Sequence, residues 1–92
     1  MHTLEIDLAL LEPVKAECDS EFLHVTLSDG VVLTVPLWWY PRLFEATPKQ
    51  RKNIELSPFG VHWEEIDEDI SVEGLLKGAK APGAREPVEA AE

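Results

Sequence analysis

The segment from residue 62 to residue 69 gathers the side chains best suited to proton transfer. His62 is followed by a dense run of acids, and imidazole is the side chain whose ordinary pKa lies nearest neutral pH. A small enzyme centred on His62 and this acidic loop is therefore one hypothesis. The acidic loop contains Glu64, Glu65, Asp67, Glu68 and Asp69. Of these, Glu64, Asp67 and Asp69 are candidate interaction residues together with His62. No nucleophile elbow or phosphate-binding glycine loop accompanies them, so we predict no catalytic residue and expect an outward-facing histidine beside a solvated acidic loop.

The same acids raise the question of a bound cation. Asp67, Asp69 and Ser71 stand at positions 1, 3 and 5 of an EF-hand calcium loop. That loop also needs glycine at position 6 and glutamate at position 12, where this chain has Val72 and Gly78. The 3 histidines of the sequence show no spacing typical of zinc, so a zinc site would have to be assembled from distant segments and carboxylates. We therefore predict no metal and no cofactor.

Three consecutive aromatic residues, Trp38, Trp39 and Tyr40, form the strongest candidate for a binding surface. Neighbouring positions on a helix differ by about 100° in direction, so the three side chains cannot all face the core. At least one tryptophan is expected to be partly exposed, and tryptophan and tyrosine dominate the energetics of protein interfaces. We expect Arg42 and the acidic loop to border this surface. The alternative, a lid of aromatic side chains over the core, remains open.

The chain carries a formal charge of −10, yet a basic patch interrupts the acidic sequence. The patch consists of Arg42, Lys49, Arg51 and Lys52. A nucleic-acid-associated regulator that uses this patch is an alternative function, because clustered lysine and arginine bind phosphates. The acidic domain as a whole would repel phosphate, which makes a solvated helix face the simpler interpretation.

Residues 21–36 show the clearest pattern of secondary structure. Alternating and β-branched residues flank Asp29 and Gly30, and an Asp-Gly pair between two strands is the usual signal of a β-hairpin. A third strand over residues 13–17 completes an antiparallel meander, and residues 59–63 add a short strand. The alternation over residues 4–10 predicts a further strand, although a helix fits that segment nearly as well.

Short helices are predicted after the meander. The first covers residues 37–44, where apolar residues recur at helical spacing. The second starts at Thr47 as N-cap, with Gln50 closing a capping box, and the third runs from Ser71 to Gly78. We therefore predict an α+β fold: a small antiparallel sheet of three or four strands with two or three short helices on one face.

The expected core draws on every predicted element. Its residues are Val14, Phe22, Leu27, Val35, Leu37, Leu43, Phe44, Ile54, Val61, Trp63, Ile70, Leu75 and Leu76. Residues 79–92 contain one sizeable apolar side chain among prolines, glycine and charges, so burial cannot offset the entropy of ordering them. We therefore predict a single α+β domain over residues 1–78 and a disordered C-terminal tail over residues 79–92.

Cysteine content and the N-terminal sequence indicate the compartment. Cys18 is the only cysteine, so no intrachain disulfide can form, and the N-terminus lacks the features of a secretory signal. The longest nearly unbroken apolar stretch, residues 31–41, is far shorter than the roughly 20 residues that a membrane-spanning helix needs. We expect a cytoplasmic protein without a membrane segment.

Several segments resemble a known family. LSDG at residues 27–30, PLWWYPRL at 36–43, TPKQRKN at 47–53 and GVHWEEIDEDISVEGLL at 60–76 are similar to the bacterial domain of unknown function family 2442. The similarity spans residues 13–78 and implies a small α+β domain with an antiparallel sheet and no established activity. It also implies a neighbouring second small family, for which a toxin–antitoxin pairing has been proposed. Some members carry a helix-turn-helix domain after this one, for which residues 79–92 are too short.

These observations favour a non-catalytic protein–protein interaction module. The resemblance adds the inhibitory, antitoxin-like member of a two-protein system as its finer form. The partner would be a second small protein, or a second copy of the chain that pairs through the N-terminal strand to give a homodimer. The nucleic-acid regulator and the small enzyme are the alternatives, and the sequence identifies neither the partner nor the biological process.

Overall fold

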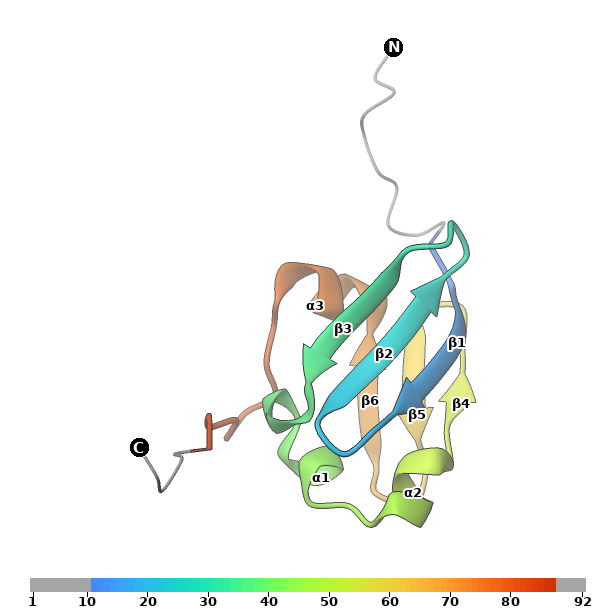
Figure 1. Cartoon of the computed structure of the whole chain (residues 1–92). Coiled ribbons are helices and arrows are strands. Elements are labelled where there is room, and N and C mark those ends of the chain that lie inside the picture. The colour runs from blue at the N-terminus through green and yellow to red at the C-terminus, as the bar shows by residue number, and fades with distance from the viewer. Residues whose placement is uncertain (1–10, 88–92) are drawn as a thin grey trace.

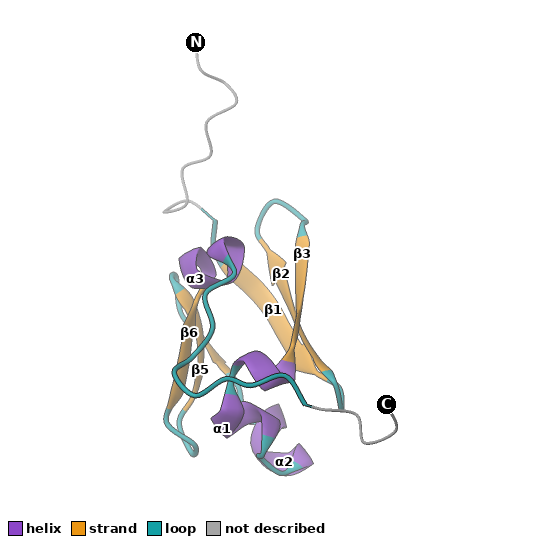
Figure 2. Ribbon diagram, turned by 90° about the vertical axis from the view of Figure 1, so that its left-hand side faces the viewer, coloured by secondary structure: helices purple, strands orange, loops and turns teal. Residues whose placement is uncertain are grey.

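A computed structural model describes residues 11–87, in which the chain forms two antiparallel sheets and several short helices (Figure 1 and Figure 2). The strand predicted over residues 4–10 lies outside the described residues. Each sheet contains three strands in their order along the chain, so strands that follow one another pair. The predicted α+β fold is confirmed, and its strands are divided between two sheets.

The first sheet is the predicted meander of β1 (Pro13–Cys18), β2 (Phe22–Leu27) and β3 (Val32–Pro36). Its hairpin confirms the Asp-Gly signal, because Gly30 has a φ of +94°, which glycine adopts without a steric penalty. The backbone N–H of Gly30 donates to the carbonyl of Leu27 at 2.9 Å. Gly30 is therefore the fourth residue of a β-turn, a position where glycine is favoured, and not one of the two central residues.

Asp19 organises the turn between β1 and β2. One of its carboxylate oxygens accepts the backbone N–H groups of Glu21 at 2.8 Å and Phe22 at 2.7 Å. The other lies 2.9 Å from Nε2 of His24. The hydrogen bond with His24 and the two backbone donors lower the pKa of Asp19 to about 2. This carboxylate is thus part of the structure of the first sheet.

The second sheet consists of β4 (Glu55–Leu56), β5 (Gly60–Trp63) and β6 (Glu68–Ser71). It contains the strand predicted over residues 59–63, and Val61 and Trp63 face the core from that strand with no exposed surface. In Figure 1, β4 lies beside β1, where the two sheets approach each other.

The sequence analysis missed β6 because its residues belong to the acidic run. The loop that was expected over residues 64–69 ends before Glu68, where the strand begins. Glu68 and Ile70 are buried, whereas Asp69 and Ser71 are exposed, so the segment alternates as a half-buried strand does. The burial of Glu68 raises the pKa of its carboxyl. A charged residue at an inward position concealed the strand pattern.

The helix predicted over residues 37–44 is divided into a 3₁₀ helix, η2 (Leu37–Trp39), and α1 (Pro41–Phe44). Tyr40 separates them with φ −128° and ψ 92°, an extended conformation. The residue before a proline is sterically driven out of the helical region, so Pro41 starts a new helix instead of continuing the first.

The remaining helices confirm their predicted start signals. Before α2 (Pro48–Lys52), the Gln50 backbone N–H donates to Thr47 Oγ1 at 3.1 Å and the Thr47 N–H donates to Gln50 Oε1 at 2.9 Å. Ser71 caps α3 (Val72–Lys77), which ends at the predicted glycine. Figure 2 shows α3 at one end of the two sheets and α1 with α2 at the other. The helices therefore close the ends between the sheets, a finer arrangement than the expected packing on one face.

The core lies between the two sheets. Leu23 and Val25 from β2 meet Trp63 and Ile70 from the second sheet within one cluster of buried side chains. The predicted core residues that are buried are Leu27, Val35, Leu37, Leu43, Val61, Trp63, Ile70 and Leu75. The expected α+β core is thus largely present, although its two sides come from different sheets.

Some predicted core residues lie at the surface. They are Val14, Phe22, Phe44 and Leu76, which are 55%, 37%, 38% and 39% exposed, and Ile54 is only partly buried. Phe22 faces outward because Leu23 occupies the inward position, and successive strand residues point to opposite faces. Val14 lies at a β-bulge, where the strand register shifts.

The packed part of the chain continues beyond residue 78, where the sequence analysis placed the domain boundary. The backbone N–H of Ala79 donates to the carbonyl of Gly74 at 2.9 Å, and that of Ala81 donates to the carbonyl of Trp39 at 3.0 Å. Ala81 also packs against the core, and Nζ of Lys80 lies 4.6 Å from the centre of the Trp39 ring. Residues 79–81 are therefore attached to the domain.

Candidate functional site

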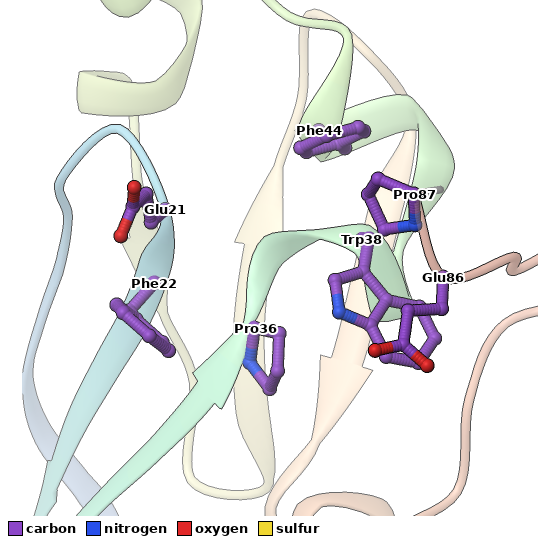
Figure 3. A pocket seen from close by; sticks show the side chains of 7 residues that line it. All are labelled: Glu21, Phe22, Pro36, Trp38, Phe44, Glu86 and Pro87. Carbon is purple, nitrogen blue, oxygen red and sulfur yellow. The ribbon is translucent and has the colours of Figure 1, made fainter. Parts of the chain in front are cut away.

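An apolar groove of about 460 Å³ lies where the first sheet meets η2 and α1 (Figure 3). We call it the Trp38 groove. It is lined by Glu21, Phe22, Pro36, Trp38, Phe44, Glu86 and Pro87. Aromatic rings and prolines supply most of its side chains, a composition found in binding grooves for extended peptides.

Local structure places the apolar side chains of the groove at the surface. Phe22 and Pro36 are partners in the register of β2 and β3, so their side chains share the outer face of the first sheet. Trp38 is the central residue of η2 and is half-buried, and Phe44 is the last residue of α1. The groove therefore collects two residues, Phe22 and Phe44, that the sequence analysis had assigned to the core.

Glu86 and Pro87 come from the C-terminal segment, far along the chain from the other lining residues. Figure 3 places them on the Trp38 side of the groove, across from Glu21 and Phe22. The sequence analysis included no residue after 78 in the folded domain. No local pattern in the segment marks these two residues, since their position depends on how residues 79–81 dock on the domain.

The consecutive aromatic residues have different environments. Trp38 lines the groove, whereas Trp39 contacts Lys80 and Ala81. Tyr40 is only 4% exposed, and its hydroxyl lies 3.5 Å from the carbonyl oxygen of Ala79. Burial raises the pKa of Tyr40 to about 12. Both hypotheses for this cluster therefore describe part of it: Trp38 faces a groove, and Tyr40 belongs to the core.

Arg42 and the acidic loop contact each other, and neither is among the residues that line the Trp38 groove. Nη1 of Arg42 donates a hydrogen bond of 2.6 Å to the backbone carbonyl of Asp67 and lies 3.8 Å from its carboxylate. Asp67 has a φ of +56°, a left-handed conformation that aspartate tolerates better than most residues. The guanidinium thus holds the turn between β5 and β6.

A second arginine of the basic patch is also used within the fold. Nε of Arg51 donates to the carbonyl of Leu43 at 3.2 Å, and Nη2 donates to the carbonyl of Phe44 at 2.8 Å. These carbonyls lie at the end of α1, where helix carbonyls lack partners within the helix. Arg42 and Arg51 therefore satisfy backbone groups, and the patch is less available to phosphates than its sequence indicates.

His62 and three carboxylates meet on the outer face of the second sheet. Nε2 of His62 lies 3.0 Å from Oε1 of Glu64, and Nδ1 lies 3.6 Å from Oδ1 of Asp69. The hydrogen bond with Glu64 raises the pKa of His62. Glu55 adds a third carboxylate, because it is the register partner of His62 on β4. We call these four residues the His62 cluster.

His62, Glu64 and Asp69 are candidate residues from the sequence alone, whereas Glu55 is not. Only the pairing of β4 with β5 brings Glu55 beside His62, and β4 has two residues and no recognisable strand pattern. The cluster can hold a proton or a cation between its imidazole and carboxylates. The His62 cluster and the Trp38 groove share no residue. The predicted interaction residues therefore lie in more than one surface feature.

Cys18 carries a thiol, a further side chain with nucleophilic chemistry in the described part of the chain. It faces inward on β1 and is half-buried, and burial raises its pKa to about 11. Since the thiolate is the nucleophilic form of cysteine, a thiol with this pKa is unreactive near neutral pH. Cys18 is therefore a packing residue.

Two small three-stranded sheets, with helices that close the ends between them, define a class of compact α+β domains. This chain belongs to the family described as "Protein of unknown function (DUF2442)", which matches residues 13–81. The match confirms the resemblance noted in the sequence, and it extends to the residues that dock beside Trp39.

Two solved structures have the same fold. A protein of unknown function from Rhodospirillum rubrum superposes with a TM-score of 0.70 at 29% identity, over 80% of this chain and 94% of that one. An uncharacterised protein from Chromobacterium violaceum, solved in solution by NMR, gives a TM-score of 0.68 at 28% identity, over 78% of this chain and 70% of that one. Among curated proteins, no match is found.

None of the helices within residues 11–87 is long and apolar enough to cross a membrane.

Proposed function

We propose that this chain is a non-catalytic protein-interaction module whose Trp38 groove binds an extended, proline-containing segment of a partner protein. The observation that carries the proposal is the position of Glu86 and Pro87, which line the groove together with Trp38 and Phe44. This C-terminal segment is an example, within the same chain, of the kind of ligand that the groove accommodates.

The chemistry of the groove supports a ligand of this type. Phe22, Trp38 and Phe44 offer apolar ring faces, and proline-rich segments dock on aromatic surfaces with little loss of entropy because their extended conformation is already restricted. Glu21 adds a carboxylate at the groove, and the whole chain has a formal charge of −10. The preferred partner segment therefore combines proline with lysine or arginine, since complementary charges favour encounter and fix orientation.

In its finer form, the proposal makes the chain the inhibitory member of a two-protein system. The support for this form is the family resemblance and the groove, which offers a surface through which a second small protein could be held. It is tested by co-expression: the growth defect caused by the partner should be relieved by the wild-type chain and not by a folded Trp38→Ala variant.

The nucleic-acid alternative has less support than the groove. Two of the four basic residues proposed to contact phosphate, Arg42 and Arg51, donate hydrogen bonds to backbone carbonyls of the fold. Those guanidinium groups would have to break their hydrogen bonds in order to bind phosphate, so the patch would attract a nucleic acid only weakly. Salt-dependent retention of the chain on DNA would revive this alternative.

The experiment that tests the proposal compares three single variants in affinity capture followed by peptide mapping. Trp38→Ala and Phe44→Ala remove ring faces of the groove, whereas Phe59→Ala removes a ring that is 69% exposed and does not line the groove. Circular dichroism and urea unfolding confirm that each variant is folded. A true groove ligand is retained by the wild-type chain and the Phe59 variant and is lost by both groove variants.

Peptide mapping then identifies the bound segment of the captured protein. We expect overlapping synthetic peptides to bind only where they contain proline beside a basic residue, and to shift the indole N–H signal of Trp38 in NMR spectra. A partner that binds Trp38→Ala and Phe44→Ala at full strength would contradict the proposal, as would a binding peptide without proline.

A further inference from the structure

The register of the second sheet aligns three side chains across its outer face. Glu55 on β4 pairs with His62 on β5, and His62 pairs with Asp69 on β6. Side chains of directly opposed residues share a face, with Cβ atoms about 5 Å apart. Glu64 follows β5 in the turn, and its carboxylate reaches back to His62 at 3.0 Å. Backbone pairing and this contact together place four ligand-type residues in one small area.

Potential ligand atoms of Glu55, His62 and Glu64 lie close together. Nε2 of His62 is 3.0 Å from Oε1 of Glu64. One ligand atom from each of Glu55, His62 and Glu64 lies within 4.8 Å of the other two. On the opposite side of the ring, Nδ1 is faced by the Asp69 carboxylate at 3.6 Å. Metal-binding histidines usually donate the N–H of the ring nitrogen that does not bind the metal to a carboxylate, a carbonyl or water, and Asp69 is the carboxylate on that side of His62.

We propose that Glu55, His62 and Glu64 form a binding site for a divalent transition-metal cation, with Asp69 as the residue that orients the imidazole. His62 would supply Nε2, and Glu55 and Glu64 would each supply one carboxylate oxygen. This donor set of one nitrogen and two oxygens, with a position left for water, suits Zn²⁺ and similar ions. An imidazole distinguishes the site from a simple acidic cluster, which would favour calcium or magnesium.

The site needs only small side-chain movements to close on an ion. Ligand atoms at about 2.0–2.1 Å from a tetrahedral ion lie about 3.3 Å apart. The pair of His62 and Glu64, at 3.0 Å, would open slightly, and the third ligand atom, which lies within 4.8 Å of the other two, would move inward. Glu55 is exposed and the Glu64 side chain is 79% exposed, so both can change rotamer without displacing the core. His62 is held on the rigid central strand of the sheet. The formal charge of −10 further favours a cation.

The test is a titration of the full, tag-free chain with ZnCl₂, measured by calorimetry and by competition with a chromophoric chelator. His2 lies outside the described residues and could bind zinc by itself, so all proteins carry His2→Gln. We expect one equivalent of Zn²⁺ to bind. His62→Gln should weaken binding by more than the 10- to 100-fold that is typical for loss of an outer partner, and Asp69→Asn should weaken it about tenfold.

His24 provides the matched control. Its Nε2 lies 2.9 Å from the Asp19 carboxylate and its Nδ1 lies 3.1 Å from the hydroxyl of Thr34. Among the described residues, His24 belongs to no group of three potential metal ligands. We expect His24→Gln to bind Zn²⁺ as the parent chain does. Glu64→Gln removes a ligand from an exposed position and should lose binding while keeping the circular dichroism spectrum unchanged. It therefore tests the site even if His62→Gln fails to fold.

Two results would overturn the inference. One is the absence of any competition with the chelator by the parent chain, and the other is equal affinity in the parent, Glu64→Gln and folded His62→Gln proteins. Retention of binding by Trp38→Ala is expected, because the groove and the cluster share no residue. The outcome for zinc is thus independent of the outcome for the groove.

Discussion

The indole nitrogen of Trp63 donates a hydrogen bond of 3.0 Å to the backbone carbonyl of Arg51. Trp63 belongs to β5 and has no exposed surface, whereas Arg51 lies in α2. The guanidinium of the same arginine reaches the carbonyls of Leu43 and Phe44 at the end of α1. One buried ring and one surface arginine therefore connect the second sheet to both helices at that end of the domain.

We expect Trp63→Phe to destabilise the domain by about 2–3 kcal/mol, because it removes the donor from a half-buried carbonyl and leaves space in the core. Urea unfolding measures the loss. Trp39→Phe is the matched control: Trp39 is half-buried and donates no such bond among the described contacts, so it should cost less than about 1 kcal/mol. Equal losses in the two variants would show that the Trp63–Arg51 bond adds nothing specific.

Gly30→Val should destabilise the hairpin through backbone conformation alone. A side chain at Gly30 would meet no atom within 4 Å, but the φ of +94° is strained for a β-branched residue. A cost of about 1–2 kcal/mol is expected, and Gly30→Asn should cost less because asparagine tolerates positive φ better. A shift in urea midpoint that is the same for both substitutions would contradict this explanation.

A chain that ends at residue 78 should be less stable than one that ends at residue 81. The sequence alone predicts that all residues after 78 are dispensable, but Ala79 and Ala81 donate backbone hydrogen bonds to Gly74 and Trp39. We expect truncation after residue 78 to cost about 1–2 kcal/mol in thermal or urea unfolding, and truncation after residue 81 to cost much less. If the shorter chain unfolds at the same midpoint as the longer one, these contacts do not stabilise the domain.

Stability at low pH should depend on Asp19. Its folded-state pKa of about 2 lies below the ordinary 3.8, so the carboxylate stabilises the fold above pH 3.8 and this contribution disappears as the pH falls towards 2. Asp19→Asn can keep the turn, because its carbonyl oxygen still accepts the N–H groups of Glu21 and Phe22. The urea midpoint of the wild-type chain should exceed that of the variant near neutral pH, and the two should converge as the pH falls through this window. Parallel curves would exclude the mechanism.

Local signals in the sequence predicted local structure well. The capping box at Thr47, the cap at Ser71 and the Asp-Gly hairpin each depend on residues a few positions apart, and each is confirmed. The prediction that Phe22 is buried was wrong. Phe22 shares the outer face of β2 with His24 and Thr26, whereas three aliphatic residues form the buried face.

Long-range arrangement explains what the sequence could not predict. Glu55 joins His62 only through the pairing of a two-residue strand, and the Trp38 groove combines four separate segments of the chain. Glu68 occupies an inward position of β6, so this strand lacks the alternation of apolar and polar residues that would have indicated it. Trp38 and His62 could be selected by residue type, but their neighbours depend on pairings that no local spacing encodes.

Because Glu86 and Pro87 lie at the Trp38 groove, they would compete with a partner segment that binds there as proposed. A tethered segment acts at an effective concentration that is commonly millimolar, whatever the concentration of the protein. A partner that binds the groove would therefore show an apparent dissociation constant equal to the intrinsic constant divided by the fraction of chains whose groove is uncovered. Affinities measured with the whole chain would be weaker than the affinity of the uncovered groove for the same partner. Substitutions near Pro87 would change this apparent affinity without changing any domain residue that the partner contacts.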